Sequence, residues 1–188
     1  MIEREKLLSI LDEQVENKNI IKHMLAVEAC MRELAKKLGA ENEDDWAVAG
    51  LVHDLDYRDD IPAEKHGLLV GGILEKEGIK LSEDILHAIA AHNWSNTGVK
   101  PKSLMDWALF TCDSLTGLIV ACALVRPDKK LASVGVESVL KKFPQKKFAA
   151  GTRREDIKMC EKKLGIPLQE FVGICLKAMQ DISKDMEL

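Results

Sequence analysis

Residues 107–125 read WALFTCDSLTGLIVACALV, an apolar run of nineteen residues in which Asp113 is the only charge. The run is long enough to cross a bilayer. A carboxylate at mid-span would be costly in lipid, however, and a helix that is apolar on all sides is also typical of a soluble protein core. No other segment of the chain is similarly apolar. We therefore predict a buried core helix here and no membrane association.

Helical signals also dominate on both sides of this run. Ser103 and Asp106 form a capping-box-like start for the apolar helix. Apolar spacing, capping residues and terminal glycine or proline predict further helices over residues 3–16, 19–38, 44–55, 62–77, 82–92 and 152–165, and another after Pro167. Residues 134–139 are compatible with a short strand or with a short helix capped by Ser133. No alternating pattern of useful length occurs elsewhere, so the predicted fold class is all-α.

Length and cysteine content indicate an ordinary globular chain. The 188 residues suit one domain, or one domain with a small appendage. The five cysteines form no Cys-x-x-Cys pair, which predicts reduced, buried thiols in a cytoplasmic protein rather than a disulfide framework. The first residues, MIEREKLLSILDEQ, lack the apolar core of a signal peptide.

Charge is distributed unevenly along the chain. The formal net charge is −4, but residues 126–163 contain twelve basic and five acidic residues. This basic segment raises the alternative of a nucleic-acid binder. Only 4% of the residues are aromatic and the rest of the chain is acidic, so nucleic acid is disfavoured as a partner.

One shared binding partner would account for the positions of four polar residues in the sequence. His53 and Asp54 are adjacent, and adjacent helical residues point about 100° apart, so both reach one ion only at a helix end. Residues 50–55 are where that helix is expected to end. His23 lies near the inward edge of its own helix, and Asp113 is a buried carboxylate that is costly without a partner. Each residue alone is more often structural, but a metal ion satisfies all four.

The order and surroundings of these residues resemble the HD superfamily of metal-dependent phosphohydrolases over roughly residues 20–125. The segments that carry the resemblance are GLVHDLDY (50–57), HGLLVGGILEKEG (66–78), DILHAIAAHNW (84–94) and ALFTCDSLTGLI (108–119). The tail, with VLKKFPQKKFAAGTRRED (139–156), is similar to a small uncharacterised branch of predicted hydrolases. The resemblance implies an HD-domain helical bundle, with residues 1–125 as the metal-binding core and 126–188 as a basic helical extension packed on it.

The resemblance also implies roles for single residues. The ligands that it implies for a first metal are His23, His53, Asp54 and Asp113. Of these, His53 and Asp54 are the implied catalytic pair. His66 and His92 match residues that complete a second metal in two-metal members, where Asp54 would bridge both ions.

Two features depart from the ligand pattern. His87 lies five residues before His92, about 140° around the helix, and is expected to face away from the site. Some members have Gly-Lys after the His-Asp pair and others have Glu three residues later, whereas this chain continues Leu55, Asp56, Tyr57. A mechanism that relies on such a lysine or glutamate is therefore not expected here.

The implied activity is hydrolysis of a phosphomonoester, from a nucleotide or another small phosphorylated metabolite, through a metal-activated water. A mixed His/Asp shell suits one or two ions of Mn, Fe, Co, Ni or Zn. The basic residues expected to bind substrate phosphate are Arg58, Lys100, Lys102, Arg153 and Arg154. Two alternatives stay open: a di-iron oxygenase of the HD type, which uses the same ligand order, and a non-catalytic nucleotide-binding HD module. A homo-oligomer is compatible with the sequence.

Overall fold

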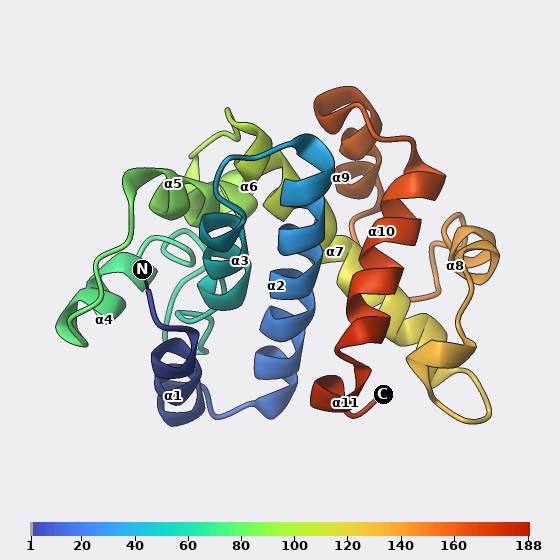
Figure 1. The fold of residues 1–188 in the computed structure, drawn as a ribbon, viewed down its shortest axis with the longest axis horizontal. Helices are drawn as coiled ribbons and strands as arrows, with labels where there is room; N and C mark the ends of the chain where they lie inside the picture. The colour runs from blue at the N-terminus through green and yellow to red at the C-terminus, as the bar shows by residue number, and fades with distance from the viewer. Residues whose placement is uncertain (1) are drawn as a thin grey trace.

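The computed structural model describes residues 2–188, and every regular element within that range is helical (Figure 1). The α-helices are α1 (Arg4–Gln14), α2 (Lys18–Leu38), α3 (Glu43–Val52), α4 (Val70–Lys76), α5 (Glu83–His92), α6 (Trp94–Thr97), α7 (Leu104–Leu124), α8 (Val136–Lys142), α9 (Arg154–Met159), α10 (Leu168–Asp181) and α11 (Ser183–Met186). A 3₁₀ turn spans Leu131–Ser133 and a π-helical turn spans Cys160–Leu164. The predicted all-α fold class is confirmed.

Helix α7 is the central element of the fold. It packs against α2, α5, α9 and α10, and Leu109, Leu115 and Leu118 are fully buried. Ser103 and Asp106 form the predicted capping box at its start. Within residues 2–188 it is the one helix long and apolar enough to cross a membrane, but most of its apolar stretch is buried inside the protein. The apolar run therefore forms a core helix, as predicted.

Helices α2 and α3 approach each other unusually closely. A Cβ on Gly50 would lie 2.9 Å from the backbone of Val27 and Glu28 in α2, so only glycine fits at this position. The contact brings the end of α3 beside the middle of α2. The helix starts differ slightly from the prediction, because Asn17 and Asn42 provide the caps rather than Asn19 and Asp44.

The predicted helix over residues 62–77 is mostly wrong. Only Val70–Lys76 is α-helical, and the residues before it form a series of turns. Gly67 has φ +90°, which no α-helix contains, and its backbone N–H donates to the buried carboxylate of Asp56. The Asp56 side chain thus accepts a backbone hydrogen bond that, in a helix, a carbonyl of the preceding turn would accept.

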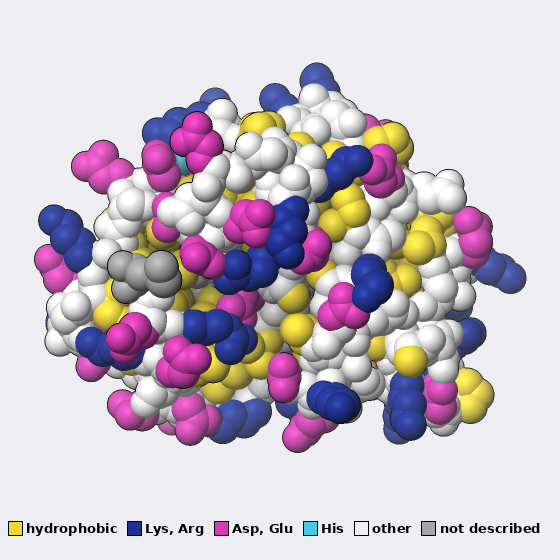
Figure 2. Space-filling model, in the orientation of Figure 1, with side chains coloured by type: hydrophobic (Ala, Val, Ile, Leu, Met, Phe, Trp, Pro, Cys, Tyr) yellow, Lys and Arg dark blue, Asp and Glu magenta, His cyan; other side chains and the backbone are white. Residues whose placement is uncertain are grey.

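The segment after α7 packs back onto the core. Helix α10 lies alongside α2 (Figure 1), and its residues Phe171, Val172 and Cys175 are fully buried. Residues 136–142 form a helix, which resolves the strand or helix alternative. All five cysteines are buried and free. On the face drawn in Figure 2, basic and acidic side chains are interspersed rather than segregated by sign.

Candidate metal centre

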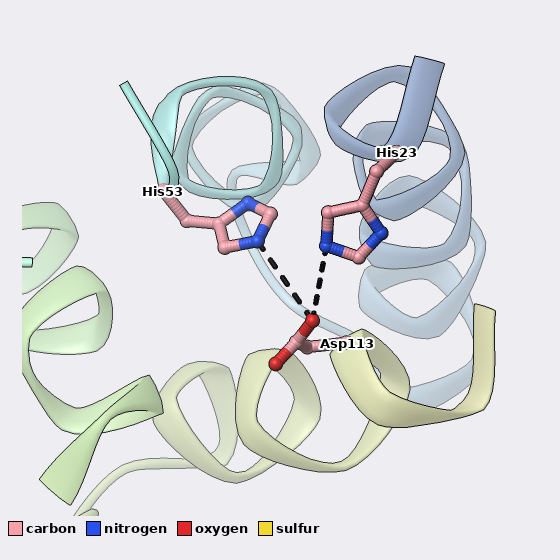
Figure 3. A group of neighbouring side chains, drawn as sticks. All are labelled: His23, His53 and Asp113. Atoms are coloured by element: carbon pink, nitrogen blue, oxygen red, sulfur yellow. Dashed lines mark ion pairs between the residues drawn. The ribbon is translucent and has the colours of Figure 1, made fainter. Parts of the chain in front are cut away.

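Three helices bring the first four predicted ligands together. Helix α3 ends at Val52, so His53 and Asp54 lie in the turn beyond it and are free to face the same point. His23 comes from α2 and Asp113 from α7. The Nε2 atom of His23 is 3.0 Å from Oδ1 of Asp113, and Nε2 of His53 is 3.9 Å from the same oxygen (Figure 3).

Asp54 lies between two groups of histidines. Its Oδ2 is 3.6 Å from Nε2 of His23. Its Oδ1 is 3.4 Å from Nε2 of His53, 3.2 Å from Nε2 of His66 and 3.6 Å from Nε2 of His92. One carboxylate therefore faces both the residues predicted for a first ion and the two predicted for a second.

His87 lies outside this cluster. Its Nδ1 is 2.9 Å from Oδ2 of Asp106, the buried residue of the α7 capping box. This placement matches the expectation that His87 faces away from the other histidines.

The outer nitrogen of each clustered histidine already has an acceptor. Nδ1 of His53 donates to the carbonyl of Gly50 at 2.8 Å, and Nδ1 of His66 donates to Oδ1 of Asp56 at 2.9 Å. Nδ1 of His92 donates to the carbonyl of Ile89. The hydroxyl of Thr116 donates a hydrogen bond to the backbone carbonyl of Asp113, so it accepts one from Nδ1 of His23 at 3.1 Å. These bonds leave every Nε2 directed at the cluster.

These contacts fit a divalent metal ion. Nε2 of His53 is buried and has no hydrogen-bond partner anywhere in residues 2–188, so the fold leaves one lone pair unsatisfied. Ligand atoms about 2.0–2.2 Å from one ion lie roughly 3.0–3.6 Å from each other, close to the spacing found here. Candidate donor sets are His23, His53 and Asp113, and His53, Asp54 and His92, with each set's atoms within 4.8 Å of one another. In proteins, a histidine that binds a metal through one ring nitrogen usually donates the N–H of the other nitrogen to an acceptor, as each histidine does here.

Burial and mutual contacts shift the pKa values of these groups strongly. Burial lowers the pKa of His53 to about 4, so this imidazole is neutral at physiological pH. Burial also lowers the pKa of His66, but hydrogen bonds to Asp54 and Asp56 outweigh it and raise the pKa to about 9. For Asp113, burial is outweighed by the hydrogen bond from His23, which brings the pKa to about 2. The cluster thus holds ionised carboxylates together with imidazoles.

Comparison with known proteins identifies the family. A family model described as HD domain matches residues 20–117. The chain belongs to the HD domain family. Ribonuclease Y of Oleidesulfovibrio alaskensis is 34% identical over 101 residues, which are 54% of this chain and 18% of that protein. The chain thus covers only a small part of this relative's length. No solved structure matches significantly.

Sequence reasoning missed a buried carboxylate of this HD domain. Asp56 is fully buried, whereas the sequence shows it only as a departure from the family pattern. Its oxygens accept the backbone N–H of Gly67 at 2.9 Å and of Leu69 at 3.0 Å, besides Nδ1 of His66. Asp56 therefore orients His66 and shapes the turn that carries it. The only available signal was a second aspartate two residues after the His-Asp pair.

A pocket of about 550 Å³ opens over the histidine cluster of the HD domain. Tyr57, Ser114 and Gly117 line it together with the clustered residues other than the fully buried His53, and residues 149–153 of the C-terminal segment form another part of its wall. The residues after α7 therefore contribute directly to the site.

Of the five basic residues predicted to bind substrate, only Arg153 lines this pocket. Its guanidinium also pairs with Asp156 at 2.6 Å. Arg58 pairs instead with Asp60 at 3.2 Å. Lys100 and Lys102 are exposed side chains that do not line the pocket. The structure therefore does not bring these three side chains to the pocket, and their closeness in sequence to His92 or Asp54 does not determine where a flexible side chain points.

The side chain of Arg154 does not line the pocket either, because it donates hydrogen bonds to a loop. Its guanidinium donates to backbone carbonyls of the loop before α9, which belong to Phe143, Gln145, Phe148, Ala149 and Thr152. Ala149 adopts φ +45°, a strained conformation for a residue with a Cβ, and these hydrogen bonds help to hold it. Arg154 therefore fixes the part of the pocket wall formed by residues 149–153.

We expect Arg154→Ala to destabilise the protein by roughly 2–4 kcal/mol, because several charge-assisted hydrogen bonds are lost. Arg154→Lys should recover little, since an ammonium lacks the planar fork that reaches several carbonyls. Denaturant unfolding and limited proteolysis at residues 143–153 measure the effect. Lys158→Ala, an exposed basic residue of the same helix, is the control. Unchanged stability and unchanged proteolysis in Arg154→Ala would contradict this role.

Proposed function

We propose that this HD domain is a metal-dependent hydrolase of phosphomonoesters, either of a nucleotide or of another small phosphorylated metabolite. In this proposal the first divalent ion is bound by His23, His53, Asp54 and Asp113. A second ion is bound by His66 and His92, with Asp54 shared between both. The observation that supports it is the position of Asp54, whose two oxygens face both groups of histidines within 3.2–3.6 Å.

A bound divalent ion of this kind activates water and offsets the negative charge that develops on a phosphoryl group during hydrolysis. The donor set suits Mn, Fe, Co, Ni or Zn. The chain's own residues then have distinct tasks. The hydrogen bonds that each Nδ1 donates keep the imidazoles in one orientation, Arg153 binds a phosphate oxygen, and the loop 149–152 keeps bulk water away from one side of the site. Residues 126–188 thus act as an extension that completes a core formed by residues 1–125.

A second candidate substrate is a phosphodiester in RNA. The similarity to a protein named ribonuclease Y favours it, although only a small part of that protein is covered. The buried, free cysteines support a cytoplasmic location for either activity.

Metal analysis of protein purified without added ions, followed by assays across Mn, Fe, Co, Ni and Zn, tests the proposal. The assays compare a panel of phosphomonoesters with short single-stranded RNA. Turnover of phosphomonoesters that is lost with chelator supports the leading candidate, and turnover of RNA alone supports the second. Iron binding with O₂ consumption and no phosphate release would replace both with an HD-type oxygenase. Bound nucleotide without turnover would indicate a non-catalytic module.

The proposed second ion makes a separate prediction. His66→Ala and His92→Ala should each halve the bound metal, from about two ions per chain to about one, because each removes a ligand that only the second ion uses. His87→Ala is the matched control, since His87 contacts Asp106 and lies outside the cluster. Metal content by elemental analysis decides the outcome. About one ion per chain in wild type and in both variants would mean that the site is mononuclear, and two ions in all three proteins would mean that His66 and His92 are not ligands.

A further inference from the structure

A second cavity, of about 320 Å³, adjoins the metal pocket between α2, α7 and α11. His23 and Gly117 line both cavities. The rest of its wall is largely apolar and includes Ala26, Val120 and Met186. We call this cavity the apolar groove.

Gly117 lies at the boundary between the metal pocket and the apolar groove. It is an exposed glycine in the interior of a 21-residue helix whose neighbouring residues are mostly buried. A Cβ at this position would meet nothing closer than Oγ1 of Thr152, at 3.9 Å. Glycine in a helix interior costs stability relative to alanine, and here no close contact with the rest of the protein requires it. Its effect is to leave the boundary open.

One face of α7 connects the two cavities. Asp113, Gly117, Val120 and Leu124 follow one another at spacings of four, three and four residues, which places them along one side of the helix. Asp113 lines the metal pocket, Gly117 lines both cavities, and Val120 and Leu124 line the groove. A bound molecule can therefore extend from the metal cluster along α7 without crossing a side chain at position 117.

We propose that the apolar groove binds the apolar moiety of the substrate, such as a short alkyl chain or a single aromatic ring, while the anionic head group lies at the histidine cluster. The inference rests on the proposed function for the identity of that head group. Two features support binding of an apolar group in the groove: the open position at Gly117 and the apolar lining beyond it. Lys22 pairs with Glu187 at the rim, which joins α2 to the C-terminal residues beside the groove.

Two substitutions change the groove at opposite ends. Gly117→Leu places a side chain at the boundary between the cavities. Leu124→Glu introduces a charge at the far end, and since Leu124 is 50% exposed this change should not prevent folding. Leu104→Glu is the matched control, because Leu104 belongs to the same helix, is 47% exposed and does not line the groove.

The experiment measures dissociation constants of methyl-, butyl- and hexylphosphonate, and of the carboxylates with the same chains, for the metal-loaded protein. Burial of one CH₂ strengthens binding up to about fourfold. We expect hexylphosphonate to bind wild type and Leu104→Glu at least about 30-fold more tightly than methylphosphonate. This ratio should fall below about threefold in Gly117→Leu and Leu124→Glu. If Gly117→Leu does not fold, Leu124→Glu decides.

The two head groups separate failure of the groove from failure of the proposed function. Phosphonates that bind equally well at all chain lengths, or a chain-length effect that both variants retain, would overturn the groove and leave the proposed function intact. Carboxylates that show the chain-length effect while phosphonates do not bind would support the groove and contradict a phosphate head group. Absence of binding by either series would overturn both.

Discussion

Asp113→Asn is expected to lower metal-dependent activity by more than about 100-fold, beyond the loss typical of a residue that only orients a ligand. Asp113 is a half-buried carboxylate that faces Nε2 of His23 and of His53. Asparagine keeps the shape but loses the charge that would bind a cation. The substitution should lower the stability of the metal-free protein at neutral pH by only roughly 1–2 kcal/mol, because the pairing with His23 that lowers the pKa of Asp113 is lost while Asp54 still faces His23.

Thermal melts with and without chelator test this expectation. Wild type should lose stability on chelation, since an ion at 100 times its dissociation constant stabilises the native state by about 2.7 kcal/mol. Asp113→Asn should respond much less. If the variant melts far below wild type in chelator and still binds metal normally, Asp113 is half of a structural ion pair and is not a ligand.

Asp56→Ala is expected to destabilise the metal-free protein by roughly 3–5 kcal/mol. The change leaves the backbone N–H groups of Gly67 and Leu69 and the Nδ1 of His66 without their acceptor. His66 would also lose its fixed orientation, so we expect affinity for a second ion to fall about 10–100-fold. Asp56→Asn should lie between Asp56→Ala and wild type, because an amide retains one acceptor oxygen.

Urea unfolding in chelator and metal titration of the folded protein measure the two effects separately. Asp60→Ala is the control, since this exposed aspartate follows four residues later and pairs only with Arg58. A loss of less than about 1 kcal/mol in Asp56→Ala, with unchanged metal affinity, would show that the turn does not depend on this carboxylate.

Local patterns predicted the helices where capping residues, a terminal glycine or an apolar run mark their extent. The capping box at Ser103 and Asp106, the end of α2 at Gly39 and the buried run of α7 all agree with the structure. The pattern failed over residues 62–69, which look helical in isolation. There the backbone amides bond to Asp56, and no local rule reports a partner more than ten residues away.

The candidate ligands could also be selected from the sequence, because Asp113 is the one charge in an apolar run and the order His23, His53-Asp54, Asp113 resembles the HD superfamily. The sequence predicts that His23, Asp113 and the adjacent His53 and Asp54 share one ion. The substrate-binding residues could not be selected in this way. A charged residue on a loop is compatible with many directions, and only Arg153 among five candidates lines the pocket.

Sequence alone predicts the all-α class and the core position of α7 from local periodicity, and it groups His23, His53, Asp54 and Asp113 from the cost of burying charge; His66 and His92 join them only through the family resemblance. Tertiary structure decided the rest. It directed the two oxygens of Asp54 to different histidines, used Asp56 and Arg154 as internal hydrogen-bonding groups, and left an open position at Gly117 beside an apolar groove. These features depend on how distant segments pack, because a hydrogen-bond partner or a cavity exists only where two such segments meet.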